Sequence, residues 1–218
     1  MNKKGFIFDL DGVIVDTAKY HFLAWKKLAN TIGIDFSETQ NEKLKGVSRI
    51  KSLEKILQWG NIRINNNEFE KLMAKKNEDY LGYIDAMDEN EILSDIPKVL
   101  HFLQKEKQGI ALGSASKNAR MILEKVTLLK KFDYIVDGND VIKGKPNPEV
   151  FLKASKLLQI NPENCIVFED SVAGIQAANS VKMMSIGIGD KKTLYEADYV
   201  FKDFTEISTD FMKDLINN

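Results

Sequence analysis

The chain has 218 residues, a length that fits one large domain or a core domain with a smaller insertion. Hydrophobic residues make up 44% and charged residues 29% of it, a globular composition that excludes disorder across the whole chain. Lys and Arg total 31 against 32 Asp and Glu, and this balance predicts no nucleic-acid partner and no anionic membrane partner, while permitting a small phosphorylated ligand.

Short apolar runs along the chain predict strands that are buried on both faces. In chain order these runs are Gly5–Asp9, Gly109–Ser114, Tyr134–Gly138 and Cys165–Asp170, with weaker candidates at Met183–Ile188 and Asp198–Phe201. Helix-like segments alternate with them near 94–107, 118–130, 148–158 and 172–179. This alternation predicts an α/β fold, with a Rossmann-like parallel sheet covered by helices on both faces.

The segment between the first two strands breaks the alternation, because its apolar residues recur only at helical spacing. They are Phe22, Trp25, Leu28, Ala29 and Ile32, then Ile50, Leu53, Ile56 and Leu57, then Phe69, Leu72 and Met73. An all-helical block at this place predicts a cap domain inserted into the core. We expect the core domain to comprise residues 1–15 and 93–218 and the cap residues 16–92, with Asp16 at the junction.

Polar residues follow the predicted strands at their carboxyl ends, where open parallel sheets bind ligands. They are Asp9 and Asp11 after the first strand, Ser114 after the second, Lys145 after the third, and Glu169 and Asp170 after the fourth. A lone Asp or Ser at such a place is most often a turn former or a helix cap, and a lone Lys before Pro is most often solvated. Their occurrence together predicts one site.

The four carboxylates of this predicted site would repel one another strongly in a low dielectric, so a proton or a hard cation has to accompany them. Ligands that offer only oxygen, together with a phosphate partner, favour Mg²⁺. The sequence therefore predicts a magnesium cofactor among Asp9, Asp11, Glu169 and Asp170.

Four motifs, "DLDGVIVDT", "GSASKN", "KGKPNP" and "FEDSVAGIQAA", resemble those of the haloacid-dehalogenase-like superfamily of aspartate-nucleophile phosphotransferases over nearly the whole chain. The resemblance implies that Asp9 attacks phosphorus and that Asp11 is the general acid and base. It also implies that the metal takes Asp9, the backbone carbonyl of Asp11, and Asp170, with Glu169 as a direct or outer partner.

The same resemblance assigns the residues around the phosphoryl group. It implies that Ser114, the backbone N–H of Ala115 and Lys145 hold the phosphoryl oxygens during transfer. Gly12 then permits the tight turn after the acid pair. The small-molecule partner implied is a sugar phosphate.

The stretches "DTAKYHFLAW", "LKGVSR", "MAKKN" and "SASKN" together resemble the mutase branch of this superfamily, which interconverts β-glucose 1-phosphate and glucose 6-phosphate through a bisphosphate. The resemblance implies that Arg49 grips the phosphate that is not transferred. The residues implied to bind that phosphate after the intermediate turns round are Ser116, Lys117 and Asn118. Those implied to contact the sugar or organise Asp11 are Thr17, His21 and Lys76, with Gly46, Val47 and Ser52 lining the cap side.

The sequence is also compatible with other functions. A sugar-phosphate phosphatase of the same superfamily needs the same core residues, and a binding module would keep the fold without turnover. Taken alone, His21 is more often an ordinary histidine, Trp25 a core residue and Lys76 a solvated lysine. Disaccharide 1-phosphates derived from maltose or trehalose would present a similar phosphate to the cap.

The expected location is the reducing cytoplasm. The apolar run before Asp9 is too short and too soon charged for a signal-peptide core, and no stretch approaches the roughly 20 apolar residues of a membrane-spanning helix. The single cysteine, Cys165, lies in an apolar run and predicts a buried thiol. No exposed heptad or apolar stripe indicates an obligate oligomer, so we expect a monomer.

Overall fold

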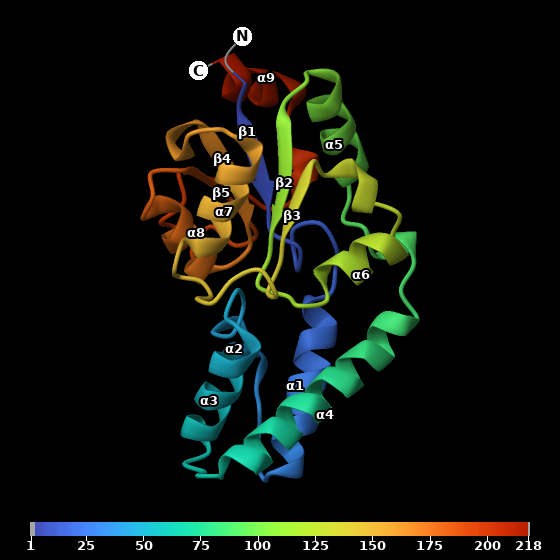
Figure 1. The fold of residues 1–218 in the computed structure, drawn as a ribbon, viewed down its shortest axis with the longest axis vertical. Coiled ribbons are helices and arrows are strands. Elements are labelled where there is room, and N and C mark those ends of the chain that lie inside the picture. The colour runs from blue at the N-terminus through green and yellow to red at the C-terminus, as the bar shows by residue number, and fades with distance from the viewer. Residues whose placement is uncertain (1–2, 218) are drawn as a thin grey trace.

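The computed structural model describes residues 3–217 and contains one six-stranded sheet (Figure 1). The strands are β1 (Gly5–Phe8), β2 (Gly109–Gly113), β3 (Tyr134–Val136), β4 (Cys165–Glu169), β5 (Met184–Ile188) and β6 (Tyr199–Phe201). They run in the order β3-β2-β1-β4-β5-β6, and every neighbouring pair is parallel. The predicted parallel sheet is confirmed, and each strand lies within its predicted range.

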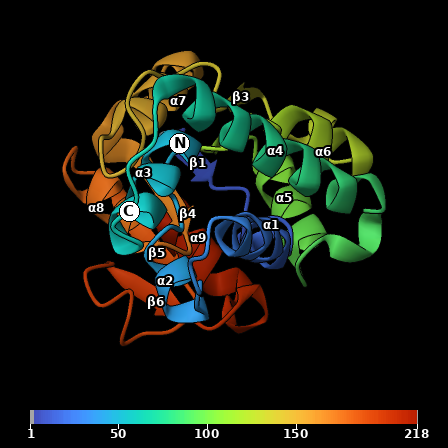
Figure 2. The same ribbon diagram turned by 90° about the horizontal axis from the view of Figure 1, so that it is seen from below.

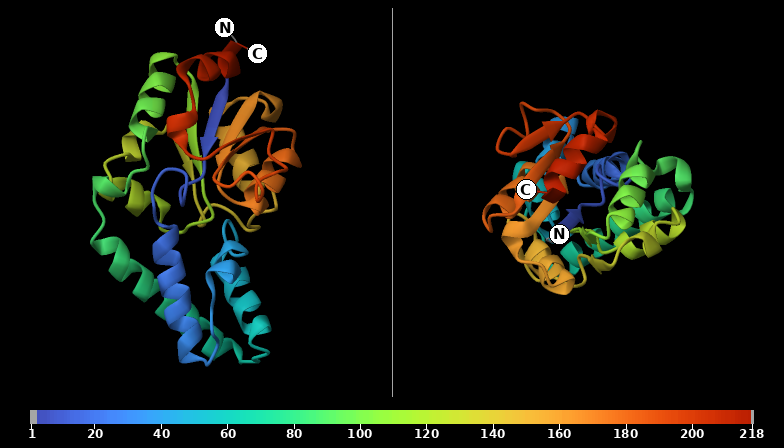
Figure 3. Two further views of the ribbon diagram at one scale, coloured as in Figure 1. Left: turned by 180° about the vertical axis from the view of Figure 1, so that it is seen from behind. Right: turned by 90° about the horizontal axis from the view of Figure 1, so that it is seen from above.

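Helices cover both faces of the sheet, as Figures 1 and 3 show. The core helices are α5 (Ile96–Lys105), α6 (Ala119–Lys125), α7 (Glu149–Leu158), α8 (Val172–Asn179) and α9 (Thr209–Asn217). Successive side chains of a strand point to opposite faces. Accordingly, Phe6 and Phe8 of β1 pack in the cluster that includes α5, α6 and α9, whereas Ile7 packs in the cluster of α7 and α8. The central strand is therefore buried on both sides, as its continuous apolar sequence predicts.

The segment between β1 and α5 forms the predicted helical cap. Its helices are α1 (Ala18–Thr31), α2 (Glu38–Glu42), α3 (Arg49–Trp59) and α4 (Asn66–Asp85), and they lie beyond the carboxyl end of the sheet (Figures 1 and 2). Reciprocal hydrogen bonds between the N-cap and the third helical residue begin α2 and α4. Trp25, Leu28 and Ile56 belong to an apolar cluster made entirely of cap residues.

Two backbone segments that run side by side join the cap to the core. The N–H of Asp16 donates to the carbonyl of Glu91 at 2.9 Å, and the N–H of Leu93 donates to the carbonyl of Ile14 at 3.0 Å. Val15 and Ile92 form an antiparallel bridge between them. Both crossings between cap and core therefore lie at one place.

The predicted helix at 118–130 is wrong at its C-terminal end, because α6 stops at Lys125. Thr127 has φ of 58°, and the N–H of Leu128 turns back to the carbonyl of Leu123 at 2.8 Å. A residue in the left-handed region ends a helix, and threonine gives little sequence warning of it. Short 3₁₀ helices occupy Glu89–Glu91, Leu129–Lys131, Pro162–Asn164 and Phe204–Glu206. Within residues 3–217, none of the helices combines the length and the apolar character needed to cross a membrane.

Candidate active site

The strand register brings the polar residues of three strands to one edge of the sheet. Phe8, the last residue of β1, pairs with Leu112 of β2 on one side and with Phe168 of β4 on the other. The residues that follow therefore meet beside the central strand. Asp9 immediately follows β1 and is only 4% exposed, so its carboxylate lies in a largely dry environment.

Lys145 forms the centre of a buried charge cluster. Its ammonium donates to Oδ1 of Asp9 at 2.6 Å and also to Oε1 of Glu169. Burial alone would lower the pKa of Lys145, but Asp9 and Glu169 outweigh it and hold that pKa above its ordinary value. Burial raises the pKa of Asp9 well above its ordinary range, and Lys145 offsets only part of the rise. The strand edge thus holds a charged lysine against a carboxylate that resists ionisation.

Both carboxylate oxygens of Glu169 are engaged by neighbours. Oε1 accepts from Lys145, and Oε2 accepts from the backbone N–H of Ser171 at 2.8 Å and from its hydroxyl at 2.7 Å. Ser171 is the N-cap of α8, and its hydroxyl accepts from the N–H of Gly174 at 3.1 Å. Glu169 therefore links the start of α8 to Lys145.

Asp170 lies beside Asp11 and Gly12 and reaches toward the cap. Its carboxylate pairs with Lys45 of the cap at 3.3 Å. A Cβ on Gly12 would come within 2.4 Å of Oδ2 of Asp170, and Gly12 has φ of 79°, so only glycine fits here. Burial raises the pKa of Asp170 to about 7, with Lys45 opposing and Glu169 adding to the rise.

Asp11 belongs to a polar chain that enters the cap. It accepts a hydrogen bond from the hydroxyl of Thr17, and Nε2 of His21 lies 3.5 Å from the same oxygen. Nδ1 of His21 lies 2.8 Å from the ammonium of Lys76. Although burial opposes it, the neighbouring His21 and Thr17 hold the pKa of Asp11 below its ordinary value. Asp11 is therefore ionised at neutral pH in this arrangement.

Lys76 is not the solvated lysine that its sequence context favours. It is 1% exposed, and its ammonium lies 4.8 Å from the ring centroid of Trp25 and 4.5 Å from that of Tyr80. Burial, with a smaller effect of Arg49, lowers the pKa of Lys76 well below its ordinary value. Burial and Lys76 likewise lower the pKa of His21.

Arg49 begins α3 and faces the same cavity from the cap. Ser48 caps the helix, and the hydroxyl of Ser52 donates back to the carbonyl of Ser48 at 3.1 Å. Burial lowers the pKa of Arg49, and within residues 3–217 no carboxylate counteracts that effect. Gly46 lies against the core, because a Cβ on it would come within 2.4 Å of the hydroxyl oxygen of Ser171.

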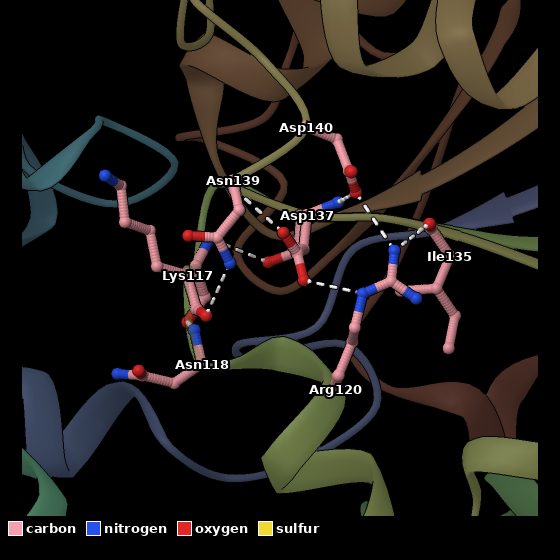
Figure 4. A network of polar contacts seen from close by, with 9 residues as sticks. Lys117, Asn118, Arg120, Ile135, Asp137, Asn139 and Asp140 are labelled. Carbon is pink, nitrogen blue, oxygen red and sulfur yellow. Dashed lines mark hydrogen bonds and ion pairs between the residues drawn. The ribbon is translucent and has the colours of Figure 1, made fainter.

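The loop after β2 forms another wall of the site. The Ser114 hydroxyl accepts from the N–H of Ser116 at 3.1 Å, and the Ser116 hydroxyl accepts from the N–H of Asn118 at 3.3 Å. The amide of Asn118 also donates to Oδ1 of Asn77 on α4 at 3.1 Å, which links this loop to the cap. Lys117 itself points away from the sheet in Figure 4.

A cavity of about 260 Å³ lies between cap and core. The residues predicted from the sequence that line it are Asp9, Asp11, His21, Gly46, Val47, Arg49, Ser52, Lys76, Ala115, Ser116, Lys117 and Asp170. Thr17, Ser114, Asn118, Lys145 and Glu169 contact those residues or each other from just behind the wall. The structure thus brings all the predicted site residues to one place.

Several residues of the site escaped the sequence analysis. Lys45 reaches Asp170, Ser171 holds Glu169, and Asn77 contacts Asn118. Lys45 directly precedes the "GVSR" stretch and could have been suspected from that neighbourhood. Asn77 stands next to Lys76 in sequence and carries no signal of its own, because its role depends on how α4 crosses the core.

The donor set fits a magnesium ion. Within the described part of the chain no three His, Cys, Asp or Glu side chains are grouped to hold a metal. Mg²⁺, however, commonly uses one or two carboxylates and completes its shell with water and substrate phosphate. Asp9 and Asp170 supply two carboxylates, and the close approach at Gly12 places Asp170 against the Asp11–Gly12 backbone. These are oxygen ligands only, which suits a hard cation.

The fold and this constellation define an aspartate-based phosphotransferase, and comparison with known proteins agrees. The chain belongs to the haloacid dehalogenase-like hydrolase family, which it matches over residues 3–182. It is 41% identical to a β-phosphoglucomutase of Bacillus subtilis, covering 96% of this chain and 93% of that protein. A crystal structure of β-phosphoglucomutase from Clostridium difficile superposes with a TM-score of 0.94 at 41% identity, covering 99% of this chain and 98% of the other. The resemblance read from the motifs is confirmed.

The chain is also similar to phosphatases. A phosphorylated carbohydrates phosphatase of Thermotoga maritima is 29% identical over 89% of this chain and 91% of its own length. The similarity to this phosphatase is lower than that to the Bacillus subtilis β-phosphoglucomutase.

Proposed function

We propose that this protein interconverts β-D-glucose 1-phosphate and D-glucose 6-phosphate, an isomerase reaction that passes through an aspartyl-phosphate enzyme and glucose 1,6-bisphosphate. The observation that carries this proposal is a shared cavity, which Asp9 lines from the core and Arg49 lines from the cap. A mutase must hold one phosphate while it transfers the other. A half-buried guanidinium without a carboxylate partner among the described residues suits the first task.

In the proposed chemistry, an oxygen of Asp9 attacks the phosphorus of the sugar phosphate in line, and the bond to the sugar oxygen breaks. Lys145, Ser114 and the N–H of Ala115 would hold the phosphoryl oxygens as charge spreads over them. Lys145 is already fixed for this task, because Glu169 holds its ammonium beside Asp9.

Asp11 would move the proton. As an ionised carboxylate it can accept the proton of the sugar hydroxyl that takes the phosphoryl group from phosphorylated Asp9, and it then gives that proton to the sugar oxygen that departs when Asp9 attacks the other phosphate of the bisphosphate. The hydrogen bond that it accepts from Thr17 and the nearby Nε2 of His21 orient it, and His21 connects it to Lys76. The lowered pKa of Asp11 supports the accepting role at neutral pH.

The remote phosphate would bind to Arg49 and to the loop of Ser116, Lys117 and Asn118. Val47 and Ser52 would line the cap side next to Arg49. Because the same anchor must accept either phosphate of the bisphosphate, it has to recognise phosphate rather than sugar, which guanidinium and backbone N–H groups do.

We propose Mg²⁺ as cofactor, held by Asp9, Asp170 and the backbone carbonyl of Asp11, with Glu169 as an outer partner because both of its oxygens are engaged. When bound, the ion would offset the negative charge of the carboxylates and the phosphoryl group. We also propose a monomer located in the cytoplasm; the free, buried thiol of Cys165 supports a reducing compartment.

The test is a product assay. The protein is incubated with β-glucose 1-phosphate, Mg²⁺ and a trace of glucose 1,6-bisphosphate, and glucose 6-phosphate and inorganic phosphate are both measured. We expect glucose 6-phosphate to form much faster than inorganic phosphate. Phosphate release at a rate equal to isomerisation would instead support a sugar-phosphate phosphatase, and no reaction with Asp9 intact would support a binding module.

An Arg49→Ala variant sharpens the distinction. We expect it to lose roughly 10- to 100-fold in kcat/KM for isomerisation, because charged hydrogen bonds to the held phosphate are removed. Arg63→Ala is the matched control, since Arg63 is an exposed cap arginine away from the cavity. Equal activity of the two variants would contradict the assigned role of Arg49.

A further inference from the structure

The loop that follows β3 contacts the loop of Ser116, Lys117 and Asn118, which we call the phosphate loop (Figure 4). The side-chain amide of Asn139 donates to the backbone carbonyl of Lys117 at 3.0 Å. One residue earlier, the N–H of Gly138 donates to the carbonyl of Ser116 at 3.1 Å. Two consecutive carbonyls of the phosphate loop are thus fixed by two consecutive residues of the neighbouring loop.

Asn139 is itself held in place by a buried carboxylate. Oδ1 of Asp137 accepts from the N–H of Asn139 at 2.8 Å, and the N–H of Asp137 donates to Oδ2 of Asp140 at 2.9 Å. Asp137 is 1% exposed. Buried polar groups need partners, so the contacts of this carboxyl group decide how firmly it can hold Asn139.

Arg120 supplies the pairing and connects it to the other end of the phosphate loop. Its Nε lies 3.1 Å from Oδ2 of Asp137, and its Nη2 donates to the carbonyl of Ile135 at 2.7 Å and to Oδ2 of Asp140 at 3.0 Å. Arg120 follows Asn118 by two residues, in the first turn of α6. The guanidinium therefore ties the far end of the phosphate loop to the segment that carries Asn139.

The two loops also touch where no side chain fits between them. A Cβ on Gly138 would come within 2.4 Å of the carbonyl oxygen of Ala115. Gly138 and Lys117 both line the cavity, whereas Arg120, Asp137 and Asn139 do not. Asn139 and Arg120 can therefore affect a ligand only through the loop that they hold.

We propose that Asn139 and Arg120 are positioning residues for the phosphate that is not transferred. They hold the Ser116–Asn118 backbone in the position in which it contacts that phosphate. They do not affect the group that reacts at Asp9. This inference rests on the proposed function for the identity of the ligand. It predicts a loss in binding of phosphorylated ligand without an equal loss in the chemical step.

Asn139→Ala is the test, and Asn179→Ala is its matched control. Asn179 is likewise exposed and lies away from the cavity; its side-chain amide donates to the carbonyl of Glu196 at 2.8 Å, and its Oδ1 accepts from the hydroxyl of Ser185 at 2.7 Å. We expect Asn139→Ala to raise the KM for β-glucose 1-phosphate about fivefold, the effect of one lost hydrogen bond, with kcat changed less than twofold. The dissociation constant of glucose 1,6-bisphosphate, measured by calorimetry, should rise by the same factor.

Arg120→Lys provides a second variant with the charge retained. Lysine lacks the planar fork that reaches Ile135, Asp137 and Asp140 together, so we expect a larger KM effect than for Asn139→Ala and again little change in kcat. The melting temperature of Asn139→Ala should be no lower than that of Asn179→Ala, which loses two side-chain hydrogen bonds, and this comparison separates positioning from a general loss of stability.

An unchanged KM and an unchanged bisphosphate dissociation constant in Asn139→Ala would overturn the inference, as would a fall in kcat with KM unchanged. A wild-type protein that binds the bisphosphate without isomerising glucose 1-phosphate would remove the proposed function. The dissociation constants would then decide the positioning role alone. A wild-type protein that binds no bisphosphate would overturn both.

Discussion

At the carboxyl edge of the sheet, the buried carboxylates outnumber the ammonium groups that pair with them. Lys145 is shared by Asp9 and Glu169, and Lys45 of the cap pairs with Asp170. Three buried carboxylates thus face two ammonium groups, and burial keeps the pKa values of Asp9 and Asp170 above their ordinary values. Such a site is destabilised when it is empty and ionised, and a bound cation would relieve it.

This imbalance predicts a pH dependence of stability in metal-free buffer. Burial raises the pKa of Asp170 to about 7, whereas an unfolded aspartate titrates near pH 4 (about 3.9), so between these values the folded state binds more protons. Folding stability should therefore fall as the pH rises from about 4 to about 7 through this group, and the raised pKa of Asp9 acts in the same direction. Thermal melting at pH 5 and at pH 8 measures the effect.

Asp170→Asn tests the assignment to this residue. The neutral isostere removes the cost of ionising a buried acid, so we expect its melting temperature at pH 8 without metal to exceed that of the wild type by a few degrees, corresponding to ~1 kcal/mol. Added Mg²⁺ should stabilise the wild type and leave this variant nearly unchanged. Asp214→Asn, at an exposed position, is the control. A variant that melts below the wild type at pH 8 would refute the charge imbalance.

At the scale of a single element, the first turn of α8 packs closely against the side chain of Glu169. A Cβ on Gly174 would lie 1.9 Å from Cδ of Glu169, far inside van der Waals contact. Gly174→Ala must therefore displace either the helix or the carboxylate that holds Lys145. We expect a loss of at least ~2 kcal/mol in the free energy of unfolding and a fall in kcat, measured by denaturant melts and by the isomerase assay.

Gly82→Ala is the matched substitution in α4. A Cβ there meets nothing within 4 Å, and the glycine is exposed in a helix interior. Alanine should stabilise the protein by about 0.5–1 kcal/mol and leave activity unchanged, because it reduces the freedom of the unfolded chain without new contacts. If both variants lost stability equally, the contact with Glu169 would not be the cause.

At the scale of the whole molecule, cap and core have partly separate interiors. One apolar cluster consists only of cap residues, while Ala24, Tyr80 and Ile84 at the base of the cap belong to the main core cluster. We propose that residues 16–92 form a domain of their own, flanked by a core domain of residues 1–15 and 93–218. The paired crossing segments at Asp16 and Glu91 would be its pivot.

Hydrogen exchange can test this organisation. Ile56 is fully buried in the cap cluster, and Ile56→Ala should cost about 2–5 kcal/mol of local stability. We expect exchange to accelerate in peptides from 22–73 and to stay unchanged in the β1, β2 and β4 strands, with Ile186→Ala in β5 giving the converse pattern. Uniform acceleration over the whole chain in both variants would mean that cap and core unfold as one unit.

Much of this architecture follows from local patterns. Continuous apolar runs of four to six residues predict buried parallel strands, and helical spacing between Phe22 and Met73 predicts the cap, because burial of one helix face needs that period. The end of α6 could not be foreseen in the same way, since nothing in the sequence around Thr127 indicates a left-handed residue. The burial of Lys76 could not be predicted either, because whether this side chain lies in solvent or in the interior depends on the helix that it packs against.

The sequence by itself determined which chemical groups are available and that they follow strand ends, because polar residues after buried apolar runs can lie only at the edge of a sheet. Only the tertiary structure decided which of these groups form ion pairs with one another. The parallel register set Asp9 between β2 and β4, next to Glu169 at the end of β4, so the ammonium of Lys145 could bridge the two carboxylates. The orientation of the cap brought Lys45 and Arg49 to the same cavity, and such contacts between distant segments depend on packing that no local pattern encodes.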